Sequence, residues 1–139
     1  MDIQAMLKMM HDARKSSATN LTIGEMLNKL NQFDDDENVV FTNEMFFDGT
    51  WGSYRGYYED MYIGCRFDDK GLNTVGNIKN TLMEALETGI MEGYKGGEYS
   101  VNNDTLVWFA RYGSTGDMIV DVKKLNGTIF IITKEDKWG

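Results

Sequence analysis

The sequence predicts an α+β domain in which two or three helices pack against an antiparallel sheet of five to seven strands. Two segments, residues 22–31 and 74–89, carry apolar residues at helical spacing and begin at a threonine. Several short segments rich in Val, Ile, Phe and Tyr are typical of strands. The chain has 15 glycines and no proline, so its turns depend on Gly, Asn and Asp.

The length of 139 residues suits one domain with its own core. We expect residues 1–139 to form that single domain, with an N-terminal helix and joint over residues 1–20 and a C-terminal hairpin and tail over residues 119–139.

The first helix is predicted over residues 2–14, where Ile3, Met6, Leu7 and Met10 form one apolar face. Methionine side chains adapt to irregular surfaces. This face therefore suits packing against a neighbouring subunit, and it equally suits folding back onto the chain's own core. Together with the apolar C-terminal hairpin it predicts a homo-oligomer.

Helix boundaries are marked by capping residues. Thr22 and Glu25 have the spacing of a capping box, and the helix that follows should end near Asn31. The next helix begins at Thr74 and should stop at Gly89, because glycine readily takes the left-handed conformation after a helix.

Strands are predicted over residues 39–41, 53–63, 105–111 and 119–122, followed by a hairpin over 125–133. The pair Asn126-Gly127 is the strongest short hairpin signal in the chain. Phe46 and Phe47 should lie just before a turn at Asp48-Gly49, which places Trp51 in a loop.

The stretch S-Y-R-G-Y-Y-E-D-M-Y-I, residues 53–63, holds four tyrosines and an arginine. As a strand it would place Tyr54 and Tyr58 on one face and Arg55 and Tyr57 on the other. Two interpretations stay open: a twisted strand with a surface arginine, or a binding floor on which rings stack while Arg55 contacts an anion.

A second unusual stretch is G-Y-K-G-G-E-Y, residues 93–99. Glycines around Lys95 could expose backbone amides to an anion. The spacing of a phosphate-binding loop is absent, however, and a glycine hairpin explains the stretch as well.

Charge and composition exclude several functions. The net charge is −8 and the pI about 4.6, which disfavours general binding to nucleic acid. The sequence has no apolar run long enough to span a membrane and no signal-peptide pattern. The single Cys65 fits a reducing cytoplasm and is expected to be a small buried group.

Catalysis is not expected, because the chain lacks a second histidine, a cysteine pair and the common catalytic motifs. We also expect no cofactor and no metal site; His11 should face solvent. One enzymatic arrangement stays open, in which Glu59 and Glu98 come together as a glycosidase-like acid and base.

The remaining possibility is binding of a small anionic ligand, and a nucleotide is the class we expect. Three cations lie within the aromatic and glycine stretches, whereas the other basic residues fall on helix surfaces, turns and tails. Arginine offers a planar fork for phosphate and a flat face for a base. The candidate ligand-binding residues are Arg55, Tyr57, Tyr94, Lys95, Trp108 and Arg111.

These motifs carry a resemblance. S-Y-R-G-Y-Y, the T-V-G-x helix start, G-Y-K-G-G-E-Y and the V-W strand resemble a group of small proteins encoded by tailed bacteriophages, over residues 22–122. Accessory phage proteins of this size often counter bacterial defence. The pattern is similar in kind to Thoeris anti-defence proteins, which sequester cyclic ADP-ribose-type signals and related cyclic nucleotides.

The resemblance implies an oligomeric protein of the host cytoplasm that binds a cyclic nucleotide without turnover. Two alternatives stay open. One is a protein-binding inhibitor of a defence complex, such as an anti-CRISPR-like acidic decoy. The other is a small nucleotide hydrolase.

Overall fold

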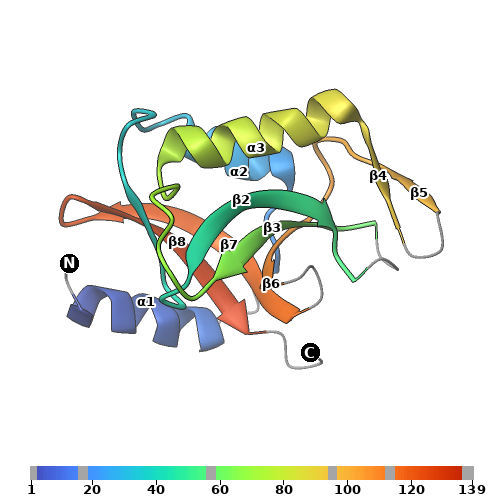
Figure 1. Cartoon of the computed structure of the whole chain (residues 1–139). Coiled ribbons are helices and arrows are strands. Elements are labelled where there is room, and N and C mark those ends of the chain that lie inside the picture. The colour runs from blue at the N-terminus through green and yellow to red at the C-terminus, as the bar shows by residue number, and fades with distance from the viewer. Residues whose placement is uncertain (1–2, 16–18, 56–58, 94–96, 112–114, 136–139) are drawn as a thin grey trace.

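The structure is a computed structural model, and it describes residues 3–15, 19–55, 59–93, 97–111 and 115–135. Figure 1 shows its elements, which follow one another along the chain as α1 (Ile3–Lys15), α2 (Ile23–Leu30), β1 (Val39–Phe41), β2 (Phe46–Ser53), β3 (Met61–Arg66), α3 (Val75–Thr88), β4 (Ile90–Glu92), β5 (Glu98–Ser100), β6 (Val107–Arg111), β7 (Thr115–Leu125) and β8 (Thr128–Glu135).

The main sheet has six strands in the order β1-β8-β7-β6-β3-β2, and β4 and β5 form a separate two-stranded sheet. The α+β class and the three helices agree with the prediction, but the sheet is mixed. The pairs β1–β8 and β3–β6 are parallel, while the other pairs are antiparallel. The chain leaves β3, passes through α3 and the small sheet, and returns to β6, and such a crossover produces a parallel pair.

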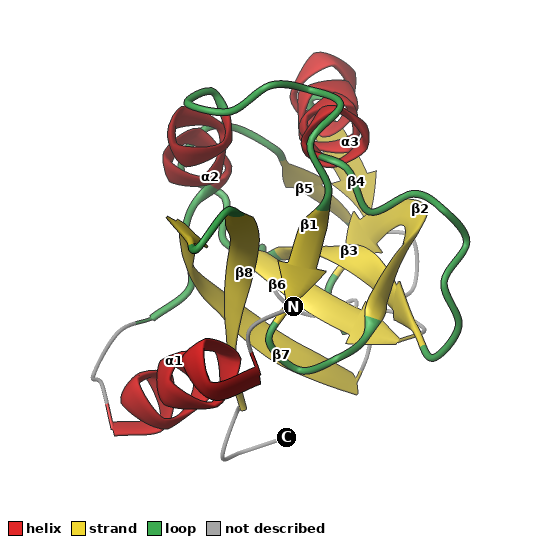
Figure 2. Ribbon diagram, turned by 90° about the vertical axis from the view of Figure 1, so that its left-hand side faces the viewer, coloured by secondary structure: helices red, strands yellow, loops and turns green. Residues whose placement is uncertain are grey.

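The main sheet curls so far that its two edge strands approach each other (Figure 2). The edge strands β1 and β2 are consecutive in sequence and are joined by the turn at residues 42–45. Asn73 bonds to both: its backbone oxygen accepts from Val39 N at 2.9 Å, and its side-chain Oδ1 accepts from Phe47 N at 3.0 Å. Asn73 therefore spans the seam of a nearly closed barrel.

The hydrophobic core fills the inside of the curl. Alternate residues of β6 show the pattern, because Val107 and Phe109 point inward while Trp108 and Ala110 belong to a separate outer cluster. Phe41 and Phe109 stack in the interior with ring centroids 3.9 Å apart. Helices α2 and α3 add their buried faces to this core.

Helix α1 lies on the opposite side of the sheet from α2 and α3 (Figure 1). Its Met6 is buried against Phe130 and Ile132, on the outer face of the β7–β8 pair. The helix thus folds back onto its own chain, which is one of the two expected arrangements. Ile3 and Leu7 on the same helix stay exposed, at 62% and 56%. None of the described helices combines the length and apolar character that a bilayer crossing requires.

The capping predictions are confirmed. Thr22 and Glu25 form a reciprocal capping box, and α2 ends with Asn31 as its C-cap. Thr74 caps α3, and Gly89 ends it in the left-handed region at φ 75°. The hairpin tip is also as predicted, since Asn126 and Gly127 both have positive φ between β7 and β8.

The expected turn at Asp48-Gly49 is wrong, because residues 46–53 form the single strand β2. The ladder with β3 shifts register between Phe47 and Trp51, so the glycine is absorbed in a β-bulge. Gly49 takes φ 88° there, and the Asp48 side chain accepts hydrogen bonds from the backbone and hydroxyl of Thr50. Bulges curve a strand, and this one bends β2 around the barrel.

The expected strand over residues 53–63 is also wrong. Strand β2 ends at Ser53, and β3 begins only at Met61. Tyr54 N donates to Asp60 O at 2.9 Å, and Arg55 has a φ of 59°, so the chain turns back here. The two-faced alternation expected here therefore does not hold for Tyr54 and Arg55, while Tyr57 and Tyr58 lie outside the described residues.

Candidate functional site

A pocket of about 320 Å³ opens at one end of the curled sheet. At this end β1, β3, β6 and β8 finish, and β2 and β7 begin. Barrel mouths are common positions for ligand sites. The mouth pocket, as we call it, is lined by Asn43, Met45, Arg55, Cys65, Phe67, Phe109, Arg111, Thr115, Gly116, Asp117 and Glu135.

Strand alternation explains why this end of the interior is charged. Arg111 lies two residues beyond the inward-facing Phe109. Asp117 pairs across the sheet with Phe109 on one side and with Glu135 on the other, and so shares their face. Just below, the buried hydroxyls of Thr42 and Thr133 hydrogen-bond at 3.1 Å. The apolar interior thus passes through a threonine pair into a charged rim.

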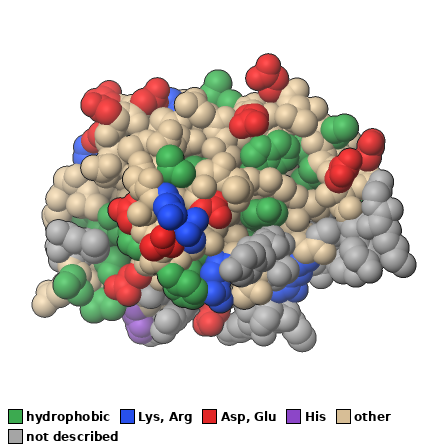
Figure 3. Space-filling view, viewed as in Figure 1, with side chains coloured by type: hydrophobic (Ala, Val, Ile, Leu, Met, Phe, Trp, Pro, Cys, Tyr) green, Lys and Arg blue, Asp and Glu red, His purple; other side chains and the backbone are tan. Residues whose placement is uncertain are grey.

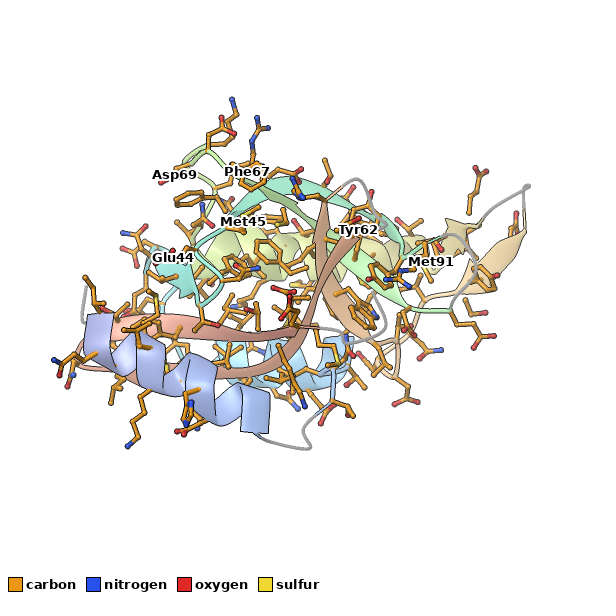
Figure 4. The ribbon with its side chains drawn as sticks, turned by 90° about the horizontal axis from the view of Figure 1, so that it is seen from below. Glu44, Met45, Tyr62, Phe67, Asp69 and Met91 are labelled. Carbon is orange, nitrogen blue, oxygen red and sulfur yellow. The ribbon has the colours of Figure 1, made fainter. Side chains whose placement is uncertain are left out.

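Each arginine of the pocket has an aromatic neighbour. The Arg111 guanidinium carbon lies 4.4 Å from the centroid of the Phe67 ring, and that of Arg55 lies 5.2 Å from the ring of Tyr54. Both distances are within the range of cation–π attraction. Phe67 is 68% exposed, so a large aromatic ring stands at the rim of the pocket. Figure 4 shows Phe67 on the same side of the molecule as Met45.

The acidic side of the pocket is held by hydrogen bonds. Asn43 Nδ2 donates to Asp117 Oδ2 at 3.0 Å, and Met45 N donates to the Asn43 side-chain oxygen at 3.1 Å. Burial raises the pKa of Asp117 above its ordinary value; the Asn43 hydrogen bond opposes this rise, and the nearby charge of Glu135 adds to it.

The thiol of Cys65 is part of the pocket wall and is 7% exposed. Burial raises its pKa to about 12, with Asp117 adding to the rise and Arg111 opposing it. The thiol is therefore protonated at neutral pH and is a poor nucleophile. This confirms the expectation that Cys65 is a small buried group.

Of the six candidate ligand-binding residues, the structure brings Arg55 and Arg111 to the same pocket. Tyr57, Tyr94 and Lys95 lie outside the described residues. Around two of these, β4 and β5 pair as an antiparallel hairpin, which agrees with the hairpin interpretation of that stretch.

Trp108 does not line the mouth pocket with the two arginines and belongs to the outer cluster instead. Its ring stacks on Tyr54 with centroids 4.3 Å apart, and its Nε1 donates to Asp60 Oδ2 at 2.9 Å. Trp108 is three residues from Arg111 on one strand, an odd spacing that puts the two side chains on opposite faces. The alternation of β6 alone was enough to separate them.

Four residues of the pocket were not among the candidates from sequence: Asn43, Phe67, Asp117 and Glu135. One of them had a readable signal, since Asp117 alternates in period two with Thr115 and Ile119 on an inward face. The strand was predicted to begin only at Ile119, so Asp117 was left outside it. Asn43 and Phe67 lie in turns beyond strand ends, where no periodic signal exists.

A second hollow, of about 560 Å³, brings together Glu59 and Glu98, the pair considered as a catalytic acid and base. It also contains Asp60. Burial raises the pKa of Asp60, and the hydrogen bond from Trp108 opposes this rise. Within the part of the chain that is described, no group of three or more His, Cys, Asp or Glu side chains is arranged to hold a metal ion.

Comparison with known proteins adds nothing to this picture. No protein-family model, curated protein or solved structure matched the chain.

Proposed function

We propose that this chain is a binding protein that takes a small anionic ligand, a nucleotide, into the mouth pocket and holds it without turnover. The observation that carries the proposal is the placement of Arg111 and Arg55 in one pocket beside an exposed aromatic ring. A phosphate group next to the guanidinium groups would accept charge-assisted hydrogen bonds, which are about twice as strong as neutral ones.

The aromatic neighbour has a second use. The exposed face of Phe67 is wide enough for a nucleobase to stack on, and stacking on an aromatic side chain contributes about 1–3 kcal/mol per base. The pocket volume of about 320 Å³ is at the lower end of the roughly 300–1,000 Å³ found for ligand sites, and so favours one nucleotide over a larger ligand.

Binding without turnover is supported by the protonated thiol of Cys65, because the cysteine in the pocket wall is then a poor nucleophile. The hydrolase alternative keeps one supporting observation, because the raised pKa of Asp117 makes it a possible proton donor in the same pocket. The two are separated by the fate of the ligand. Mass spectrometry of the ligand released by heating should show an intact molecule, whereas a hydrolysed product would indicate an enzyme.

The biological role that follows from the phage resemblance is sequestration of a cyclic nucleotide or cyclic ADP-ribose-type immune signal in the host cytoplasm. This role is part of the proposal. The acidic-decoy alternative would require a continuous acidic surface. Several acids are instead paired with bases, as in Lys124–Glu37 at 2.7 Å and Lys79–Asp35 at 2.9 Å, and basic and acidic side chains lie side by side on the face in Figure 3.

The test is a binding titration of cyclic AMP, cyclic GMP and cyclic ADP-ribose against the wild type and two arginine variants. Arg111→Gln should weaken binding of the tightest of these probes by about ten- to a hundredfold, because one charge-assisted contact contributes roughly 1.5–3 kcal/mol. Arg66→Gln is the matched control. Arg66 ends the neighbouring strand, but its guanidinium pairs with Asp68 at 2.7 Å and does not line the pocket.

The two variants carry the same change in net charge, so a general electrostatic effect would weaken both equally. That result, or an Arg111→Gln protein that folds and binds as tightly as the wild type, would overturn the proposed site. Failure of all three probes to bind would overturn the nucleotide proposal.

A further inference from the structure

The acidic pair in the mouth pocket is not explained by anion binding alone. Asp117 and Glu135 are directly opposite each other on β7 and β8, on the face that lines the pocket. Like charges in this position destabilise a sheet. Among the described residues neither carboxylate forms an ion pair, although six lysine or arginine side chains elsewhere do. A costly pair at the edge of a pocket suggests a use in binding.

A hydrogen bond orients the Asp117 carboxylate, which can still accept further hydrogen bonds from a ligand. The Asn43 amide occupies one lone pair of Oδ2, and Asn43 is itself fixed by the backbone of Met45. A carboxylate has about four acceptor positions, so most of those on Asp117 are unused by the described residues. Such a fixed acceptor is suited to reading hydrogen-bond donors on a ligand.

We propose that Asp117, with Glu135 beside it, accepts hydrogen bonds from the base of the bound nucleotide and so selects guanine. This inference rests on the proposed function. Guanine presents two adjacent N–H donors on its pairing edge, which match the two oxygens of one carboxylate. Adenine presents a donor beside an acceptor, and uracil a donor between two carbonyl acceptors, so an ionised carboxylate would face at least one lone pair. The phosphate would lie toward Arg111 and Arg55, and the base toward the acids.

The same arrangement disfavours simple anions. Inorganic phosphate at pH 8 is mainly a dianion with a single P–OH donor, so repulsion from Asp117 and Glu135 would offset the attraction of the arginines. A nucleotide with a donor-rich base satisfies both sides of the pocket. The acidic pair therefore favours nucleotides over free phosphate.

The experiment compares cyclic GMP, cyclic AMP, cyclic UMP and inorganic phosphate in equilibrium titrations at pH 8. Because burial raises the pKa of Asp117, the higher pH ensures that its carboxylate is ionised. The wild type should bind cyclic GMP about 5- to 100-fold more tightly than cyclic UMP, as for other bidentate base contacts. Asp117→Asn should remove most of this preference and tighten phosphate binding, while cyclic AMP binding changes little.

Glu98→Gln is the matched control, since it removes one negative charge outside the mouth pocket and should keep the preference. Glu135→Gln, expected to reduce the preference partly, gives a second readout should the Asp117 variant fold poorly. If the wild type binds all three cyclic nucleotides equally and still loses them in Arg111→Gln, the guanine inference fails and the proposed function stands. If no nucleotide binds, both fail.

Discussion

At the scale of single residues, the step from Phe109 to Arg111 decides the character of the site. Phe109 is fully buried and stacks on Phe41. Arg111 ends the strand, and its guanidinium lies over the exposed ring of Phe67. The residue between them, Ala110, packs on the outer face. Residue types identified the arginines as candidates from the sequence. Their pocket partners came from strand ends and turns, whose positions depend on how the whole sheet closes.

Asp117 gives a prediction on stability. Its folded-state pKa lies above the ordinary value of 3.8, so the folded protein holds this proton more tightly than the unfolded chain. The stability that depends on this proton is present below about pH 3.8 and is lost as pH rises through the raised pKa. Asp117→Asn should therefore be more stable than the wild type at pH 7 by roughly 0.2–1 kcal/mol, the usual cost of a like-charge cross-strand pair.

The difference should shrink as the pH falls toward 4, and urea unfolding at several pH values measures it. Asparagine can still accept the hydrogen bond from Asn43, so that contact is preserved. A variant that is less stable than the wild type at pH 7 would contradict this account of the acidic pair. The expected gain in stability accompanies the expected loss of base selection.

At the scale of elements, the helices were predictable and the strand pairing was not. The capping box at Thr22 and the glycine at position 89 act within a few residues of chain, so their effect is readable locally. The bulge in β2 depends on its neighbour: a Cβ on Gly64 would collide with the side chains of Asp48 and Thr50. A glycine in β3 thus makes room for the bulge in β2, which no local pattern in either segment reveals.

The seam residue Asn73 supports a second prediction. Asn73→Ala removes the oxygen that accepts from Phe47 N, leaving a backbone donor of a buried residue without this partner. The expected loss is about 1–3 kcal/mol of unfolding free energy. Asn77→Ala on α3 is the control, because in its hydrogen bonds to other described residues Asn77 contributes only backbone groups. Equal stability of the two variants in urea unfolding would show that the seam does not hold the edge strands.

A third prediction concerns the approach of β7 to β6 beside the pocket. A Cβ on Gly116 would collide with the Phe109 oxygen and the Ala110 backbone, neither of which can turn away. Gly116→Ala should cost about 1–3 kcal/mol, as overpacking usually does. Gly52→Ala should cost less, since its nearest contact is the movable Tyr62 ring at 3.0 Å. Thermal unfolding of both variants gives the comparison, and an unchanged midpoint for Gly116→Ala would contradict it.

At the scale of the whole molecule, the sequence predicted the α+β class but not the curled, mixed sheet. Parallel pairing of β1 with β8 joins residues some 90 positions apart, as in Val39 with Ile129. Local propensity does not carry such information. The mouth pocket is a product of this closure, which explains why the sequence indicated Arg55 and Arg111 as candidates and not the cavity they share.

Self-association remains a prediction at this scale. Ile3 and Leu7 are exposed on α1 after Met6 has been used to pack the helix onto β8. Light scattering at micromolar concentration should give a mass above the 15.9 kDa of one chain. Ile3→Lys with Leu7→Lys should reduce that mass, and a strict monomer in the wild type would contradict the prediction.

The central claim, that the mouth pocket binds a nucleotide, is tested most directly by an NMR titration of methyl-labelled methionines with cyclic GMP. Met45 lines the mouth pocket, whereas Met6 lies against a neighbouring apolar groove that Met45 also borders, and Met26 lies in the core. We predict a saturable shift of Met45 with Met6 and Met26 unchanged, and its loss in Arg111→Gln. A saturable shift of Met6 or Met26 with Met45 unmoved would place the ligand elsewhere and contradict the claim.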